Sequence, residues 1–211
     1  MRVISINKNI IISNLEEKFF VWSPPKTASN TLYHILEKLK FNTYLSDGKS
    51  LIFYSEKPKH NHSTNIFFGH ENFNLITTIR NPYRLMISKF LNVGGQYTVN
   101  SKSFSKFLES WLYNDENKLT YLSFYNYSER SPDNLIRVES MFDDYLKIPF
   151  IKKSDYYKSG ELLNDCNTKY NPSKCLKVDW KSLYTQNSAD MVYYNFAHVF
   201  ELGQYNKNSW K

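Results

Sequence analysis

Short apolar runs that stop at polar turns alternate along this chain with segments of helical period. The run at 18–23 (KFFVWS) is apolar and rich in aromatic residues, and it stops at Pro24-Pro25, which is typical of a buried strand. From Thr31 onward, apolar residues fall at i, i+3, i+4 and i+7, which predicts one buried face of a helix. These residues are Leu32, Ile35, Leu36 and Leu39, and Ser29 or Asn30 can cap the helix. The stretch therefore predicts a strand, a tight turn and a helix.

The same order of elements recurs twice. Leu75 to Ile79 (LITTI) is rich in β-branched residues and ends at Arg80, after which Asn81 is a suitable N-cap and Pro82 a suitable first helical residue. Leu85, Met86, Lys89 and Phe90 continue in helical period. Asn134 to Val138 (NLIRV) predicts a third strand, followed by a helix around 140–146.

Further segments complete the predicted fold. Ser50 to Tyr54 and Asn65 to Phe68 are short strand candidates, and the stretch 181–200 has a helical apolar pattern. Strands that alternate with helices favour the α/β class: a single domain over 1–211, with a mostly parallel central sheet flanked by helices. Ligands of such sheets bind at the carboxyl ends of the strands.

Composition narrows the function only slightly. The 211 residues are 41% hydrophobic and carry a formal net charge of +7, which fits one domain with a real core and favours anionic partners. A chain that is simply rich in Lys would have the same charge without such a partner. Cys166 and Cys175 are too few for a disulfide framework, although one bridge between them stays open, and no metal-ligand spacing is present. We see no signal peptide and no run of 18 apolar residues, so we expect a soluble, cytoplasmic chain without a membrane span.

The turn at 24–31 (PPKTASNT) is the most informative stretch for chemistry. It places Lys26 and a run of backbone N–H groups at a helix N-terminus, where anions bind to unpaired donors and to the positive end of the helix dipole. The turn contains no glycine, so it is not a Walker A loop. A capped helix after a polar loop, with no ligand, is the alternative.

Two motifs carry a family resemblance. Pro25 to Leu32 (PKTASNTL) resembles the 5′-phosphosulfate loop of the sulfotransferases that use 3′-phosphoadenosine-5′-phosphosulfate (PAPS), and Arg80 to Ser88 (RNPYRLMIS) resembles the 3′-phosphate motif of that family. The motifs occur in the family's order, and each follows a predicted strand. Weaker similarities are found at 135–145 and 179–205, so the resemblance spans most of the chain.

The resemblance implies a P-loop-like nucleotide-binding architecture, with PAPS as cofactor and adenosine 3′,5′-bisphosphate as its product. The cofactor-binding residues would be Lys26, Thr27, Ala28, Ser29, Asn30, Thr31, Arg80 and Ser88. Arg80 can fork onto a phosphate with two parallel N–H bonds, and Ser88 can add a hydroxyl. Without the resemblance, Arg80 reads as a surface ion-pairing residue and Ser88 as an ordinary helical residue. The family implies no catalytic metal.

The acceptor side is less well defined. His70, in a segment (GHENF) that resembles glycan O-sulfotransferases, would take the acceptor proton, while Lys26 would neutralise charge on the leaving group. Glu71 and Glu56 are competing bases. A glycan hydroxyl is the predicted acceptor, with no nucleic acid expected, but O- and N-sulfation stay open and no oligomeric state is indicated. The tracts 41–63 and 94–130 would be loops that wall the acceptor pocket.

Departures from the family pattern keep other functions open. Ala28 stands at a usual glycine, Asn30 stands at a usual hydroxyl residue, and a Gly-rich nucleotide loop is missing, for which 168–174 (TKYNPSK) is a candidate substitute. A nucleotide kinase or NTPase would share the strand-loop-helix order but would need a Walker A loop. A non-catalytic polyanion-binding module would rely on the basic charge alone.

Overall fold

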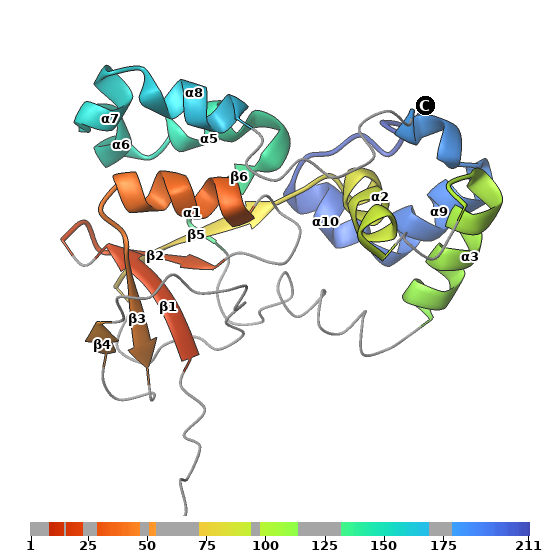
Figure 1. Ribbon diagram of the computed structural model, residues 1–211, viewed down its shortest axis with the longest axis horizontal. Helices are drawn as coiled ribbons and strands as arrows, with labels where there is room; N and C mark the ends of the chain where they lie inside the picture. Colours follow the sequence, from red (N-terminus) through yellow and green to blue (C-terminus); the bar gives the residue numbers. More distant parts are fainter. Residues whose placement is uncertain are drawn as a thin grey trace, which may run out of the picture.

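One mixed β-sheet with helices packed around it organises the chain (Figure 1). The computed structural model describes residues 9–14, 16–22, 29–46, 51–53, 72–93, 98–113, 132–168 and 179–211. Six strands in these ranges form the sheet, in the order β4-β3-β1-β2-β5-β6. The strands are β1 (Asn9–Asn14), β2 (Phe19–Trp22), β3 (Asn42–Ser46), β4 (Leu51–Phe53), β5 (Asn74–Ile79) and β6 (Asn134–Arg137). The α/β class is therefore confirmed.

The sheet is mixed, and the expectation of a mostly parallel sheet is wrong for the described strands. Within these ranges, β1 pairs antiparallel with both β2 and β3, and β3 pairs antiparallel with β4. Only residues 15–18 separate β1 from β2, and so short a connection permits only an antiparallel hairpin. The sequence pattern did not predict β1, because its apolar run, Ile10 to Ile12, is short. It also assigned β3 to a loop wall of the acceptor pocket.

The parallel part of the sheet matches the prediction. β2 pairs in parallel with β5, and β5 pairs in parallel with β6. The strands predicted at 18–23, 75–79, 134–138 and 50–54 are all present, whereas the candidate at 65–68 lies outside the described residues. Five of the six residues of β5 are buried, as expected for a central strand.

The helices that follow the parallel strands are also those predicted. They are α1 (Ser29–Lys38) after β2, α2 (Pro82–Val93) after β5, and the short η2 (Val138–Ser140) and α5 (Met141–Tyr145) after β6. Further helices are α3 (Ser101–Leu112), α6 (Pro149–Lys153), α7 (Asp155–Lys158) and α8 (Glu161–Asn167). The predicted C-terminal helical stretch consists of η3 (Trp180–Leu183), α9 (Gln186–Asn195) and α10 (Ala197–Leu202). Helix α3 corrects part of the loop expected at 94–130.

Two groups of helices bury two separate apolar clusters. The carboxylate half, as we call it, consists of α1 and α5 to α8, which pack on one face of the parallel strands through Val21, Ile76 and Ile136. The aromatic half consists of α2, α3, η3, α9 and α10, which pack against Ile79 of β5. Figure 1 shows the two groups on either side of the point where β5 ends. Strand β5 therefore contributes to both clusters and passes between the two groups.

Candidate functional site

The carboxyl ends of the parallel strands bring the two predicted binding motifs to one edge of the sheet. Trp22, the last residue of β2, lies opposite Thr77 of β5, and Ile79 lies opposite Arg137 of β6. Neighbouring strands are about 4.8 Å apart. Strands β2 and β5 therefore end at the same edge of the sheet, and the segment 23–28 and the turn at Arg80 follow them in the sequence. Ligands of parallel sheets bind at this edge.

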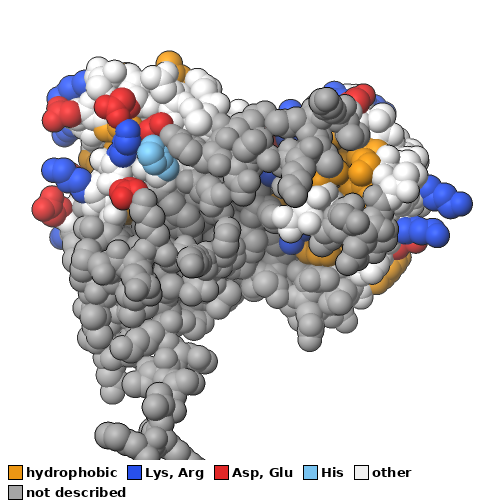
Figure 2. All heavy atoms as spheres, in the orientation of Figure 1, with side chains coloured by type: hydrophobic (Ala, Val, Ile, Leu, Met, Phe, Trp, Pro, Cys, Tyr) orange, Lys and Arg blue, Asp and Glu red, His pale blue; other side chains and the backbone are white. Residues whose placement is uncertain are grey.

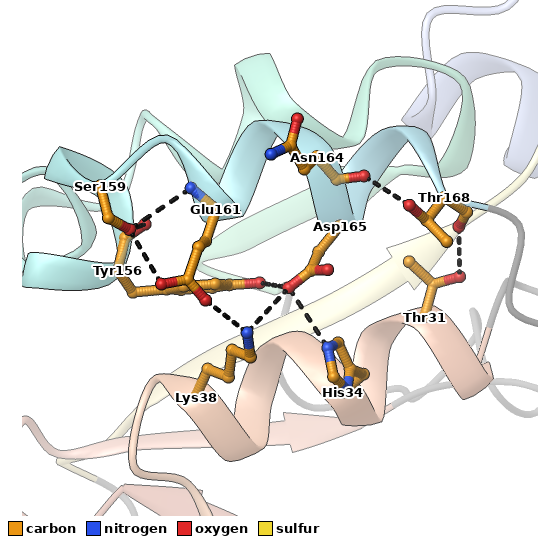
Figure 3. A network of polar contacts seen from close by, with 9 residues as sticks. All are labelled: Thr31, His34, Lys38, Tyr156, Ser159, Glu161, Asn164, Asp165 and Thr168. Carbon is orange, nitrogen blue, oxygen red and sulfur yellow. Dashed lines mark hydrogen bonds and ion pairs between the residues drawn. The ribbon is translucent and has the colours of Figure 1, made fainter.

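The first motif is described only from α1 onward. Lys26, Thr27 and Ala28 lie outside the described residues. Ser29 and Asn30 are the first residues of α1 rather than its cap, which is a boundary difference of one or two residues. Thr31 is buried, and its Oγ1 donates to the carbonyl oxygen of Thr168 over 3.5 Å (Figure 3).

The contact with Thr168 bears on the candidate nucleotide loop. Thr168 directly follows α8 and is the first residue of the segment 168–174, whose other residues lie outside the described ranges. That segment therefore starts beside the first turn of α1, which follows the predicted anion-binding turn in the sequence.

The second motif begins where β5 ends. Arg80 is the first residue after the strand and is partly buried. Asn81 caps α2 through its Oδ1, which accepts from the backbone N–H of Tyr83 over 3.0 Å, and Pro82 is the first helical residue. The predicted cap and the predicted helix start are both confirmed.

Ser88 lies six residues after Pro82 in α2, on the side of the helix that is not buried. Tyr83, Leu85, Met86, Ile87 and Phe90 face the aromatic cluster. Arg84 and Ser88 keep accessible surface on the opposite stripe, one helical turn apart. Ser88 is therefore partly accessible on the side of α2 that faces away from the aromatic cluster.

A hydrogen-bonded network that the sequence did not reveal surrounds the Arg80 turn. The backbone N–H of Asn81 donates to Glu139 Oε1 over 3.2 Å, and the hydroxyl of Tyr205 donates to Glu139 Oε2 over 2.9 Å. The side chain of Asn81 donates to Ser209 Oγ over 2.9 Å. The short helix η2, which directly follows β6, and the C-terminal segment thus both hold the turn. The only signals in the sequence were the similarities at 135–145 and 179–205, which gave no contacts.

Next to this network, Asp144 holds the end of β6. Arg137 binds its carboxylate in a forked arrangement with distances of 2.9 and 2.8 Å, and Lys147 donates over 2.6 Å. Burial opposes ionisation of Asp144, but the hydrogen bonds from Arg137 and Lys147 outweigh it and lower the pKa of Asp144 to about 2. The guanidinium of Arg137 is thus paired with the carboxylate of Asp144.

A second polar cluster joins α1 to α7 and α8 (Figure 3). One oxygen of Asp165 accepts from the hydroxyl of Tyr156 over 2.5 Å, and it lies 3.3 Å from His34 Nε2 and 3.6 Å from Lys38 Nζ. Lys38 also pairs with Glu161 over 2.5 Å. The cluster fixes α8 along α1 and thereby places Thr168 beside Thr31.

The base candidates His70, Glu71 and Glu56 all lie outside the described residues. Among the histidines that are described, His34 has a carboxylate partner, which sequence spacing could not show because Asp165 lies 131 positions further on. Within the described ranges, no group of three His, Cys, Asp or Glu side chains is placed to hold a metal ion. The thiol of Cys166 is free, and burial together with Asp165 raises its pKa to about 12. Cys175 is outside the described part.

Comparison of the chain with protein-family models, with characterised proteins and with solved structures gave no match. The sulfotransferase resemblance therefore rests on the sequence motifs alone. In the part of the chain that the structure describes, no helix has both the length and the apolar character needed to cross a membrane.

Proposed function

We propose that the chain is a PAPS-dependent sulfotransferase with a P-loop-like nucleotide site at the carboxyl edge of β2, β5 and β6. The observation that carries the proposal is the parallel pairing of β2 with β5, because it delivers both motifs to one edge. The N-terminal turn of α1 and the Arg80 turn can then contact the two phosphate-bearing ends of one nucleotide.

The described surroundings of the site are compatible with an anionic ligand. Glu139 is the acidic side chain that contacts the Arg80 turn, and it accepts hydrogen bonds from Asn81 and from Tyr205. Asp144, the next carboxylate along the chain that is buried, is compensated by Arg137 and Lys147. The charge of Asp144 is thus balanced by two cations, whereas the neutral donors that bind Glu139 satisfy its oxygens without cancelling its charge. Glu139 is solvent-exposed, where water and salt screen it from a bound phosphate, so the described residues permit an anionic ligand.

Bound PAPS would supply an activated sulfuryl group. His70 would take the proton from an acceptor hydroxyl, which we propose belongs to a glycan, as the acceptor oxygen forms its bond to sulfur. Lys26 would neutralise the negative charge that grows on the bridging oxygen when adenosine 3′,5′-bisphosphate leaves. As in phosphoryl transfer, positioning and electrostatic stabilisation would do most of the catalysis.

The test is a calorimetric titration with adenosine 3′,5′-bisphosphate in the absence of metal. We expect micromolar binding to the parent chain. We expect a loss of at least about 30-fold in Lys26→Ala and Arg80→Ala, because truncating one partner of a hydrogen-bonded charge pair costs roughly 2–5 kcal/mol. Lys106→Ala is the control, since it removes the same charge from the exposed face of α3.

The other outcomes identify the other functions. A parent chain that binds ATP with Mg²⁺ but not the bisphosphate would be a nucleotide kinase or NTPase. A chain that binds only polyanions, with a steep salt dependence, would be a binding module. Equal loss of affinity in Lys106→Ala and Arg80→Ala would indicate general charge attraction and no defined phosphate site.

A further inference from the structure

The peptide bond that follows Arg80 is held from outside its own helix. The N–H of Asn81 belongs to the peptide unit that joins Arg80 to Asn81, and it donates to Glu139 Oε1 over 3.2 Å. Asn81 is buried, and both ends of its side-chain amide are engaged, with Tyr83 N–H on one side and Ser209 Oγ on the other. The backbone direction in which the chain leaves β5 is therefore fixed by residues from η2 and from the C-terminal segment.

The position of Glu139 depends in turn on Tyr205. The hydroxyl of Tyr205 donates to Glu139 Oε2 over 2.9 Å, while the ring of Tyr205 covers Gly203. A Cβ atom at position 203 would overlap that ring, so any larger residue there would displace the ring of Tyr205. Gln204 between them adopts a left-handed backbone conformation with φ of 54°, which folds the ring back onto Gly203.

The same segment holds the first turn of α2 at a second point. The hydroxyl of Tyr83 donates to the carbonyl oxygen of Lys207 over 2.7 Å, and the hydroxyl of Tyr184 donates to the carbonyl oxygen of Tyr83 over 2.8 Å. Burial raises the pKa of Tyr83 to about 12, so the hydroxyl stays protonated and remains a donor at neutral pH. Residues 203–211 therefore contact the turn through Ser209, Lys207 and, by way of Glu139, Tyr205.

We propose that Glu139 and residues 203–211 form a clamp that sets the direction of Arg80 and thereby the affinity of the edge for a phosphate group. The inference rests on the proposed function, since it gives Arg80 a ligand. Glu139 and Tyr205 act through Asn81 and are positioning residues. A forked Arg–phosphate contact depends strongly on geometry, so a turn held in place before binding retains more of the contact energy than a turn that must be ordered by the ligand.

The clamp is tested with Tyr205→Phe, which removes one hydroxyl and keeps the ring on Gly203. We expect the affinity for adenosine 3′,5′-bisphosphate to fall roughly tenfold, in the range of one hydrogen bond to a charged group, and the amide proton of Asn81 to exchange faster. Gly203→Ala displaces the whole ring and should weaken binding further. Glu139→Ala should resemble Gly203→Ala, whereas Glu139→Gln, which retains an oxygen acceptor for Asn81, should restore most of the affinity.

Asn100→Ala is the control for general destabilisation. It removes the capping box of α3 in the same half of the molecule and contacts neither Arg80 nor Asn81 among the bonds that the structure describes. If Tyr205→Phe weakens bisphosphate binding no more than Asn100→Ala does, the clamp is overturned while the nucleotide site stands. If the parent chain binds no bisphosphate, the proposed function fails, and the clamp fails with it as a determinant of affinity. The positioning of the turn can be tested even without a ligand. If the Asn81 amide exchanges at the same rate in Tyr205→Phe as in the parent chain, Tyr205 does not hold the turn and the clamp is overturned.

Discussion

The two halves of the molecule that flank the end of β5 are stabilised in different ways. In the aromatic half, buried rings pack edge to face, as between Phe90 and Phe104 and between Phe104 and Tyr184, with centroid distances of 5.3 and 4.9 Å. The buried acidic side chains of the described residues, Asp144 and Asp165, both belong to the carboxylate half. The surfaces also differ: on the face that Figure 2 shows, acidic and basic side chains are mixed over one lobe, whereas the other has larger apolar areas with Lys and Arg side chains at its rim.

This difference determines how the stability of each half responds to pH. Aromatic packing is insensitive to pH, whereas a buried carboxylate stabilises the fold only while it is ionised and paired. The proposed nucleotide site lies between the halves: α1 comes from the carboxylate half and α2 from the aromatic half. A destabilising substitution in one half should therefore disturb the segment that this half contributes to the site before it disturbs the other segment.

The largest effect is expected in the aromatic half. Phe104 is fully buried and contacts Phe90, Phe107 and Tyr184. Phe104→Ala should lower the free energy of unfolding by about 3–5 kcal/mol, through lost burial and the cavity that remains. Urea denaturation should give the same loss at about pH 7 and about pH 5. A loss below about 1 kcal/mol would show that this half is not the tightly packed core we describe.

An intermediate effect is expected on acidification of the carboxylate half. The pKa of Asp144 is about 2 in the folded chain against 3.8 in the unfolded chain, so the unfolded chain binds the proton first as the pH falls. The stability that Asp144 contributes, about 2 kcal/mol, is fully present above about pH 5 and is lost as the pH falls through 3.8 towards 2. Asp144→Asn should flatten this part of the pH profile. A parent and a variant with parallel profiles between about pH 5 and about pH 2 would contradict the assignment.

The smallest effect is expected at the surface of the α1–α8 interface. The ion pair between Lys38 and Glu161 is solvent-exposed, and Lys38 lies at the longer distance of 3.6 Å from Asp165, which Tyr156 and His34 also contact. Lys38→Met should therefore lower the urea midpoint only slightly. Tyr156→Phe is the matched comparison, because it removes a buried hydrogen bond to Asp165 and should cost about 1–2 kcal/mol. If Lys38→Met proves the more damaging of the two, the surface charges contribute more to the interface than the buried bond does.

The sequence predicted the local order of elements better than their assembly. The strand at 75–79, the cap at Asn81 and the helix start at Pro82 follow from rules that act over a few residues, and all three are confirmed. Strand β1 was missed because its pairing is set by a hairpin with β2 and not by its own short apolar run. The mixed character of the sheet was missed for the same reason.

The candidate site shows the same limit. Arg80 and Ser88 could be selected from their motif, and the structure places Arg80 at the strand end that the motif implied. Glu139 and Tyr205 lie 66 positions apart, and neither has a local pattern that links it to Asn81. Their role depends on the parallel pairing of β5 with β6 and on the return of the C-terminal segment, which periodicity cannot reveal.

The most direct test of the central claim is hydrogen exchange of the parent chain with and without adenosine 3′,5′-bisphosphate. One ligand at the shared strand edge should protect two separated segments together: the first turn of α1 at 29–32 and the turn at 80–83. The first turn of α3 at 101–104 should exchange at an unchanged rate. Protection of only one of the two segments, or of neither at saturating ligand, would contradict a single nucleotide site built from both motifs.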